Sequence, residues 1–277
     1  MTLEIEVIWA NYWYWNFSMK VILFCGGKGT RIRAASENTP KPLLNVAGLP
    51  ILLRLMARYS AQDVNEFILA TGHMGSVFKD YFDFLKSNNT EKYRIDEFLQ
   101  LRYQSRPIDD WNINIEPTGE CNIGTRLYKL KHYLEKEKFF FANYSDSVSS
   151  IDIGQSLNVI KSENCIAAIA SVKQSQYYHW LQYDKPINLS HGASFVTSIE
   201  SSDRLKHRIN GGYMCLSGDV FEHMKYGEEL VEEPFARLIS DRKLTCYKTD
   251  EYWRSIDTYK DLLEAEDEMK SRDLRYE

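Results

Sequence analysis

The chain has 277 residues and carries 34 Lys and Arg against 39 Asp and Glu, which gives a formal net charge of −5. Apolar residues make up 44% of the sequence, too many for an intrinsically disordered chain, and the mild acidic excess argues against a general binder of polyanions such as nucleic acid. No apolar run approaches the roughly 18 residues that a membrane-spanning helix needs, so we expect no membrane partner either.

The five cysteines are scattered along the chain, and none belongs to a C-x-x-C pair. Such spacing indicates neither a disulfide framework nor a structural zinc site. We therefore expect a cytoplasmic protein.

Residues 1–18 differ in character from the rest of the chain. They hold three of the six tryptophans but no basic residue, so they lack the charged start of a secretory signal peptide. Two explanations stay open: an upstream start codon with Met19 as the true beginning, or a short partner-binding segment. In either case we expect a non-catalytic extension, followed by one folded domain over residues 19–277.

From Met19 onward, strand and helix patterns alternate. Short apolar runs predict buried strands at residues 21–24, 67–70, 139–142 and 166–171. Apolar residues at helical spacing predict helices at residues 51–59, 77–85, 127–134, 153–162 and 258–272. This alternation indicates crossover connections, so we predict a single α/β domain, Rossmann-like and three-layered, with a mostly parallel sheet. Residues 177–206 are polar and irregular, and we expect them to form an excursion over the sheet.

A glycine-rich turn follows the first predicted strand, with the sequence Cys25-Gly26-Gly27-Lys28-Gly29-Thr30-Arg31. Three glycines let backbone N–H groups approach an anion, and ligands of open α/β sheets bind at the carboxyl ends of strands. The spacing fits neither a Walker A loop nor the dinucleotide-binding fingerprint. A tight connection without a ligand is the alternative. Arg31 favours phosphate binding, because a guanidinium beside exposed amides suits a triphosphate.

Lys41 lies between Pro40 and Pro42, a short distance after this turn. Each proline fixes its own φ and restricts the preceding residue to extended geometry, so Lys41 is held on a stiff segment. A lone lysine in a turn is usually solvated. The presence of both features in one strand–helix connection favours contact with phosphate.

These two motifs, F-C-G-G-K-G-T-R-I and T-P-K-P-L, resemble the signature of the sugar-1-phosphate nucleotidyltransferases. The similarity extends over nearly the whole chain from Met19, through Pro50–Leu52, Ile68–Gly75, Asn143–Ser147, Ile209–Gly212 and Trp253–Thr258. Within this family the chain is most similar to the glucose-1-phosphate cytidylyltransferase branch, in the segments Gly72–Gly75, Thr118–Arg126 and Glu232–Pro234.

The resemblance implies that the phosphate of a sugar 1-phosphate attacks the α-phosphorus of a nucleoside triphosphate, and that pyrophosphate leaves. Such transfers depend on in-line positioning and on cations where charge develops. Asp146, at the end of a predicted strand, and Asp257 supply two carboxylates that, with triphosphate oxygens, suit Mg²⁺ as a cofactor. Taken singly, Asp146 could instead cap a turn, and Asp257 could cap the last helix.

The resemblance also implies roles for individual residues. The catalytic group is Arg31, Lys41 and Asp146, and the metal ligands are Asp146 and Asp257. The nucleotide is expected at Cys25, Gly26, Gly27, Lys28, Gly29, Thr30, Thr118, Gly119, Arg126 and Ser145, with Thr118, Gly119 and Arg126 near the base and ribose. The sugar is expected at Glu200, Asn210 and Gly211. We expect the Cys25 thiol to be a buried spacer and not a nucleophile.

The chain departs from the family pattern in two places. Ser145 and Ser147 stand where close cytidylyltransferases have glycine, and a serine strains the loop if its position needs a positive φ. Glu200-Ser201-Ser202 stands where the family often has Glu-Lys-Pro, whose lysine binds the sugar phosphate. Candidate substitutes for that lysine are Lys173, Lys206 and Arg208.

Three functions follow from these patterns. The first is an enzyme that makes CDP-glucose from CTP and glucose 1-phosphate, for cell-surface polysaccharide or deoxysugar synthesis. The second is a nucleotidyltransferase with another triphosphate or another acceptor, such as mannose or heptose 1-phosphate. The third is a catalytically silent paralogue that binds nucleotide and regulates an assembly. Relatives of this branch assemble as multimers, so we also expect a homo-oligomer.

Overall fold

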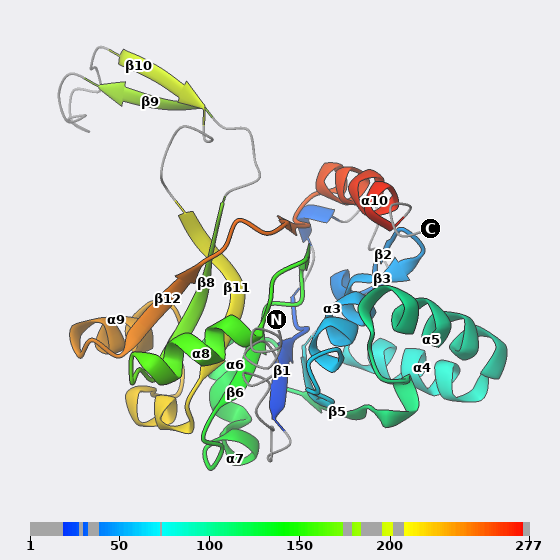
Figure 1. Cartoon of the computed structure of the whole chain (residues 1–277). Helices are drawn as coiled ribbons and strands as arrows, with labels where there is room; N and C mark the ends of the chain where they lie inside the picture. Colours follow the sequence, from blue (N-terminus) through cyan, green and yellow to red (C-terminus); the bar gives the residue numbers. More distant parts are fainter. Residues whose placement is uncertain are drawn as a thin grey trace, which may run out of the picture.

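A seven-stranded sheet forms the centre of the structure, a computed structural model that describes residues 19–27, 30–32, 39–72, 74–173, 179–183, 196–201 and 208–273. Its strands lie in the order β12-β8-β11-β6-β1-β4-β5 (Figure 1). They are β1 (Lys20–Phe24), β4 (Glu66–Thr71), β5 (Asn112–Pro117), β6 (Phe140–Asn143), β8 (Ala167–Lys173), β11 (Arg208–Leu216) and β12 (Leu244–Lys248). Only β11 runs antiparallel to its neighbours in this sheet, so the mostly parallel α/β sheet expected from the sequence is confirmed.

Alternate residues of β1 face two separate apolar layers. Val21 and Leu23 pack in one cluster, whereas Ile22 and Phe24 pack in the other, as the period of two in a strand requires. The first layer is covered by α3 (Ile51–Ser60), α4 (Gly75–Ser87), α5 (Asn89–Tyr103) and α8 (Gly154–Ser162). The second is covered by α6 (Ile123–Lys129), α7 (Lys131–Leu134), the 3-10 helix η5 (Gly218–His223) and α9 (Glu233–Ser240). The predicted three-layer arrangement is therefore confirmed.

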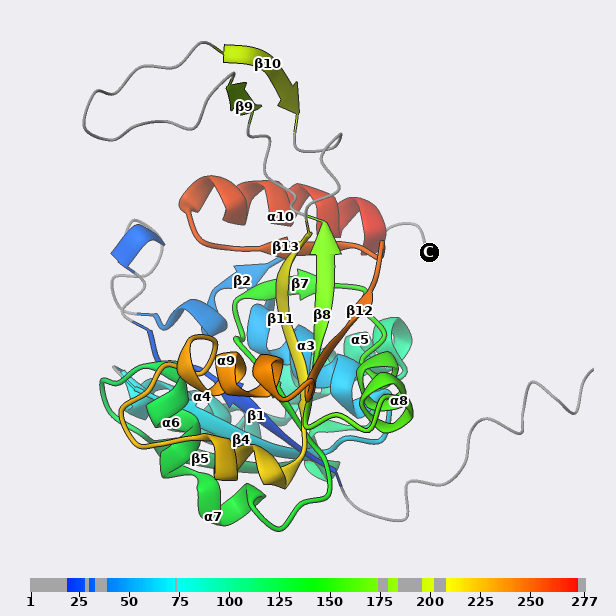
Figure 2. The ribbon, with the colours of Figure 1, turned by 90° about the vertical axis from the view of Figure 1, so that its left-hand side faces the viewer.

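A third, smaller apolar cluster lies under the C-terminal helix α10 (Tyr259–Asp273). Ala265 and Met269 of this helix pack with Ile32, which follows the glycine-rich turn, and with Val148 and Ile256. Two short antiparallel pairs are β2 (Asn45–Val46) with β3 (Leu49–Pro50), and β7 (Ser147–Ser149) with β13 (Trp253–Ser255). Figure 2 shows α10 across the same end of the sheet as β2, β7 and β13. The last helix thus covers the end of the sheet where the predicted site residues gather.

The prediction of one helix over 127–134 is wrong. The segment forms α6 and α7, which meet at Leu130 with φ −97° and ψ 11°. Leu127, Leu130 and Leu134 nevertheless pack in the same apolar cluster. The helical spacing of the three leucines therefore continues across the break between α6 and α7. For this reason the apolar pattern of the sequence does not reveal the break.

The prediction of an irregular excursion over the sheet at 177–206 is also wrong in part. Within it, β9 (His179–Tyr183) and β10 (Val196–Ser201) form an antiparallel pair of their own. Figures 1 and 2 both show this pair beyond the ends of β8 and β11, and not over a face of the sheet. Residues 1–18, Lys28, Gly29 and Lys206 lie outside the described residues. Among the described helices, none is both long and apolar enough to cross a bilayer.

Candidate active site

A cavity of about 450 Å³ opens at the carboxyl ends of β1 and β6. Ligands of parallel sheets bind at such strand ends. The cavity is lined by Phe24, Cys25, Gly26, Gly27, Arg31, Ile32, Lys41, Pro42, Ile123, Tyr144, Asp146 and Asp257. The glycine-rich turn, the lysine between two prolines and both predicted metal ligands therefore face one space.

Asp146 and Asp257 are far apart in the sequence, but a short strand pair brings them together. In the antiparallel pairing of β7 with β13, Ser147 lies opposite Ser255. Just beyond that pair, the backbone N–H of Ile256 donates to the carbonyl oxygen of Asp146 over 2.9 Å. This hydrogen bond joins Asp146 to the residue that directly precedes Asp257. Both carboxylates therefore reach the same cavity.

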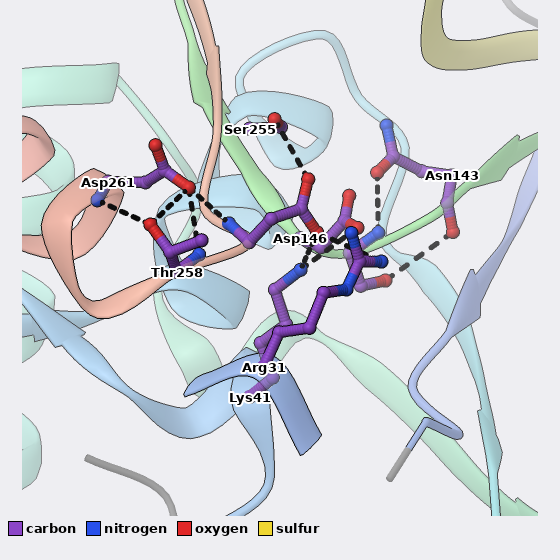
Figure 3. A network of polar contacts seen from close by, with 9 residues as sticks. Arg31, Lys41, Asn143, Asp146, Ser255, Thr258 and Asp261 are labelled. Atoms are coloured by element: carbon purple, nitrogen blue, oxygen red, sulfur yellow. Dashed lines mark hydrogen bonds and ion pairs between the residues drawn. The ribbon is translucent and has the colours of Figure 1, made fainter. Parts of the chain in front are cut away.

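Lys41 lies between the two carboxylates (Figure 3). Its Nζ is 3.2 Å from Asp146 Oδ2 and 3.0 Å from Asp257 Oδ1. The lysine begins the 3-10 helix η2 (Lys41–Leu43), where its carbonyl oxygen accepts the N–H of Leu44. Arg31 approaches from the solvent side, with Nη2 3.8 Å from the same oxygen of Asp257 and a side chain that is 77% exposed. The structure thus joins Arg31, Lys41, Asp146 and Asp257 as the sequence predicted.

The two carboxyl groups have pKa values shifted in opposite directions. Burial raises the pKa of Asp146, with a further contribution from the charge of Asp257, and Lys41 only partly offsets this. Burial also acts to raise the pKa of Asp257, but Lys41, Arg31 and the Ser255 hydroxyl together outweigh it, and the net shift is downward. Asp257 is therefore the more firmly ionised member of the pair.

The capping role considered for Asp257 belongs to other residues. Asp261 Oδ2 accepts the N–H groups of Thr258 and Asp257, and the Thr258 hydroxyl accepts the N–H of Asp261 over 3.2 Å. This reciprocal arrangement is a capping box at the start of α10 (Figure 3). The side chain of Asp257 is therefore not needed at the helix end. Its Oδ2 instead accepts the hydroxyl of Ser255 over 3.3 Å.

Ser145 adopts the left-handed conformation that its family position favours in glycine, with φ 60°. The N–H of Ser145 donates to Asn143 Oδ1 over 2.9 Å, which fixes the turn just before Asp146. Ser147 lies in β7 and has no positive φ. Of these two serines, only Ser145 is therefore strained, at a cost of about 1–3 kcal/mol.

The Cys25 thiol is buried at the start of the glycine-rich turn. Burial raises its pKa to about 12, against the smaller opposing effects of a Ser145 hydrogen bond and the Arg126 charge. A thiol that stays protonated is a poor nucleophile. Cys25 is thus a buried spacer, as expected.

Arg126 supports the glycine-rich turn from inside the protein. Its side chain is 1% exposed, and it donates to the carbonyl oxygens of Gly26 over 3.0 Å and Cys121 over 3.1 Å, and to Thr118 Oγ1. Burial lowers the pKa of this guanidinium. Arg126 thus reaches the cavity wall through Gly26, and Thr118 lies behind it as a partner of Arg126. The residue of α6 that lines the cavity is Ile123. Direct contact of Thr118, Gly119 and Arg126 with base or ribose stays a prediction.

The predicted sugar residues of β11 lie beside the cavity. Asn210 Nδ2 is 3.4 Å from the hydroxyl of Tyr144, which lines the cavity, and the carbonyl oxygen of Gly211 accepts the indole N–H of Trp253 over 2.8 Å. Pairing of β11 with β8 is irregular after Asn210, where Gly212 has φ 77°. The register shift and the positive φ mark a β-bulge at the start of β11, next to the Asn210 contact with Tyr144.

The described candidates for binding the sugar phosphate do not line the cavity. The third residue expected at the sugar, Glu200, is in β10, and its side chain is outside the described part of the structure. Arg208 donates to the carbonyl oxygens of Ser171 and Thr249 and pairs with Asp250. Lys173 pairs with the same Asp250 over 3.2 Å. Arg208 and Lys173 are therefore engaged at the end of the sheet and do not line the cavity.

Sequence reasoning missed Tyr144, Ile123 and Ser255. Tyr144 had a usable signal, because it directly follows a strand and precedes Asp146 by two positions. Ile123 had none, since an apolar residue at a helix start is ordinarily part of the core. Ser255 is recognisable only from its contact with Asp257.

Comparison with known proteins agrees with this geometry. Residues 20–176 match the nucleotidyl transferase family. The chain is 31% identical to a probable glucose-1-phosphate cytidylyltransferase of Bacillus subtilis over 252 residues, which cover 89% of this chain and 94% of the relative. It is 25% identical to a D-glycero-alpha-D-manno-heptose 1-phosphate guanylyltransferase of Campylobacter jejuni, covering 78% and 84%.

The fold is also that of known members with solved structures. A putative glucose-1-phosphate thymidylyltransferase from Bacillus anthracis superposes with a TM-score of 0.64 at 17% identity, over 90% of this chain and 94% of the other. The family match covers more than half of the chain, and the sheet, glycine-rich turn and paired carboxylates agree with it. The chain therefore belongs to the nucleotidyl transferase family.

Proposed function

We propose that this protein joins CTP and glucose 1-phosphate into CDP-glucose and releases pyrophosphate, by Mg²⁺-dependent in-line attack on the α-phosphate. The observation that carries the proposal is the bridging of Asp146 and Asp257 by Lys41 in a cavity whose wall also includes Gly26 and Gly27. Backbone N–H groups and two cations suit the phosphates, and two carboxylates suit a metal. The 31% identity to the Bacillus subtilis protein supports cytidylyl transfer to glucose 1-phosphate.

The donor set fits Mg²⁺. The Lys41 ammonium marks a point between the two carboxylates where positive charge is stabilised. Among the described residues, no group of three or more His, Cys, Asp or Glu side chains is placed to hold a metal. Two carboxylates with triphosphate oxygens and water form the all-oxygen shell in which Mg²⁺ is usually held. When bound, Mg²⁺ would neutralise charge that develops on the phosphates.

The remaining groups follow from their places in the cavity. Arg31 and Lys41 would hold the triphosphate, since guanidinium and ammonium groups both pair with phosphate. The sugar 1-phosphate would lie toward Tyr144 and Asn210. Such an enzyme would work in the cytoplasm and supply an activated sugar for cell-surface polysaccharide or deoxysugar synthesis.

A different triphosphate or acceptor is the second candidate. It is supported by the Campylobacter jejuni relative, which is a heptose 1-phosphate guanylyltransferase, and by Ser201 and Ser202 in place of the Lys-Pro of the family. A catalytically silent nucleotide-binding paralogue is the third. The four charged groups assembled at one cavity oppose it, because a silent protein has no need of them.

A pyrophosphate-release assay separates these candidates. The purified protein is incubated with Mg²⁺, each of CTP, GTP, UTP and dTTP, and glucose, mannose or heptose 1-phosphate. Turnover restricted to CTP with glucose 1-phosphate supports the proposal. Turnover with another pair replaces it by the second candidate, and no turnover in the whole panel supports the third.

A further inference from the structure

The Lys41 ammonium and a divalent ion compete for the same two carboxylates. Lys41 Nζ contacts Asp146 Oδ2 and Asp257 Oδ1, one oxygen of each carboxylate on which the proposed metal site depends. Mg²⁺ binds carboxylate oxygens at about 2.1 Å. A metal held by both carboxylates would therefore lie within a few ångströms of the ammonium, and two cations so close repel each other.

We propose that Lys41 is a built-in counter-ion, which pairs with Asp146 and Asp257 until a triphosphate binds. This inference rests on the proposed function. The phosphates take Lys41 and Arg31 as partners, and the carboxylates so released take the divalent ion. The site thus accepts the metal together with the nucleotide, and binds the metal weakly alone.

The charges of the cluster support this exchange of partners. Two carboxylates face two cations, since Arg31 is 3.8 Å from the same Asp257 oxygen that Lys41 contacts. Such a cluster has no net charge and attracts a divalent ion only weakly. A triphosphate brings its own negative charge and pairs well with Lys and Arg. Loss of both cations to the phosphates leaves the carboxylates uncompensated, so affinity for the metal rises.

The side chains are placed so that only they must move. The backbone of Lys41 is fixed by Pro40, Pro42 and the hydrogen bond from Leu44 N–H. The ammonium is carried on a flexible four-carbon side chain. Lys41 lines the same cavity as Gly26 and Gly27. Arg31 is largely exposed, and its contact with Asp257 is long, at 3.8 Å. Rotation of two side chains within one cavity is enough for the exchange.

Mn²⁺ binding tests the inference without reliance on turnover. Wild-type protein and Lys41→Met are titrated with Mn²⁺ alone, and again with α,β-methylene-CTP, and protein-bound Mn²⁺ is measured by water-proton relaxation. We expect Lys41→Met to bind Mn²⁺ alone about tenfold more tightly than wild type, and the wild type to gain a similar factor from the nucleotide analogue. Because the carboxylates of Lys41→Met are already free of the ammonium, this variant should lose most of that gain.

Lys20→Met is the matched control. This variant also removes one positive charge and one ion pair, the contact of Lys20 with Glu137 at 2.6 Å. Lys20 lies in β1 and does not line the cavity. The Mn²⁺ affinity of this variant should equal that of the wild type. Adding Asp257→Asn to Lys41→Met should abolish the tight Mn²⁺ binding, which assigns the ion to the acid pair. Melting curves of all variants confirm folding.

The outcomes separate this inference from the proposed function. Equal Mn²⁺ affinity of wild type and Lys41→Met without nucleotide overturns the inference alone, and pyrophosphate release by the wild type still stands. No Mn²⁺ binding to any protein, with or without the analogue, overturns both the inference and the proposed metal site.

Discussion

Asp146 and Asp257 both pair with Lys41, but their pKa values are shifted in opposite directions. Asp257 has a second partner in Ser255, and its pKa is lowered. The pKa of Asp146 is raised by burial, so its charge depends on a nearby cation. The proposed metal would supply that cation once Lys41 turns to the phosphates.

Replacement of either acid by its amide should therefore stop metal positioning with little change of shape. We expect Asp146→Asn and Asp257→Asn each to lower kcat by about a hundredfold or more, measured by pyrophosphate release at saturating Mg²⁺. Asp83→Asn, in an exposed ion pair with Lys79 on α4, should leave kcat unchanged. Near-normal turnover of either site variant would refute the metal role.

Gly26 and Arg126 should show coupled effects on stability. A Cβ on Gly26 would overlap the guanidinium group of Arg126, whereas a Cβ on Gly27 would meet nothing within 4 Å. We expect Gly26→Ala to be strongly destabilising in the wild type and much less so in Arg126→Met, where the space is free. Unfolding free energies from urea titration should give a coupling of about 0.5–3 kcal/mol.

The corresponding cycle with Gly27→Ala is the control for that coupling. Its effects should add to those of Arg126→Met within about 0.5 kcal/mol, because the two side chains do not meet. Additive effects of Gly26→Ala and Arg126→Met would show that the guanidinium does not confine the turn.

At the scale of elements, the sequence specifies the long buried elements and leaves the short ones open. β1 and β4 are apolar runs between glycines or polar residues. That pattern alone identifies both segments as buried strands. β7 and β13 have three residues each, too few for a period to be visible, yet their pairing joins Asp146 to Asp257. The resemblance put both acids in one site, but the means of bringing them together is a tertiary contact.

The same limit applies to elements with a weak apolar pattern. α5 buries Ile95 and Leu99 among many polar residues, and was not predicted. β11 begins with Arg208-Ile209-Asn210-Gly211, in which only Ile209 is a large apolar residue, so it resembles a loop until its pairing with β8 is known. Which of Ser145 and Ser147 is strained likewise depends on φ, which the turn between β6 and β7 sets at Ser145.

A partly exposed ion pair between Arg237 of α9 and Glu228 holds the loop that contacts the start of α6. In that loop, the carbonyl oxygen of Gly227 accepts the side-chain amide of Asn122, at the start of α6, over 3.0 Å. The hydrogen bond from Arg237 lowers the pKa of Glu228 from 4.5 to about 2. Because the folded pKa lies below the unfolded one, the pair stabilises the fold above pH 4.5 and loses that effect as pH falls toward 2.

Glu228→Gln should consequently lower the melting temperature in a pH-dependent way. The difference from wild type should be largest at pH 7 and should shrink between about pH 4.5 and 2, as measured by thermal unfolding followed by circular dichroism. Glu222→Gln, at an exposed position of η5, should show no such dependence. A constant difference at all pH values would mean that the Glu228 charge is not what stabilises the segment.

At the scale of the whole molecule, the three-layer body and the β9–β10 pair have different sources of stability. The body buries two large apolar clusters on either side of its sheet. Among the described strands, β9 and β10 pair only with each other. Val196 and Ile199 of β10 are 48% and 64% exposed. An isolated two-stranded sheet is marginally stable in water, so this pair gains most from a surface that covers it.

We expect a second copy of the chain to provide that surface, which makes the protein a homo-oligomer. Light scattering should then give a mass that is a multiple of 32.4 kDa. Ile199→Glu should lower that mass, because a charge at a covered apolar position costs several kcal/mol in the assembly. Leu101→Glu, at a 77% exposed position of α5 in the body, should leave the mass unchanged. A wild-type protein that is monomeric at micromolar concentration would contradict the expectation, and equal masses of wild type and Ile199→Glu would place the contact elsewhere.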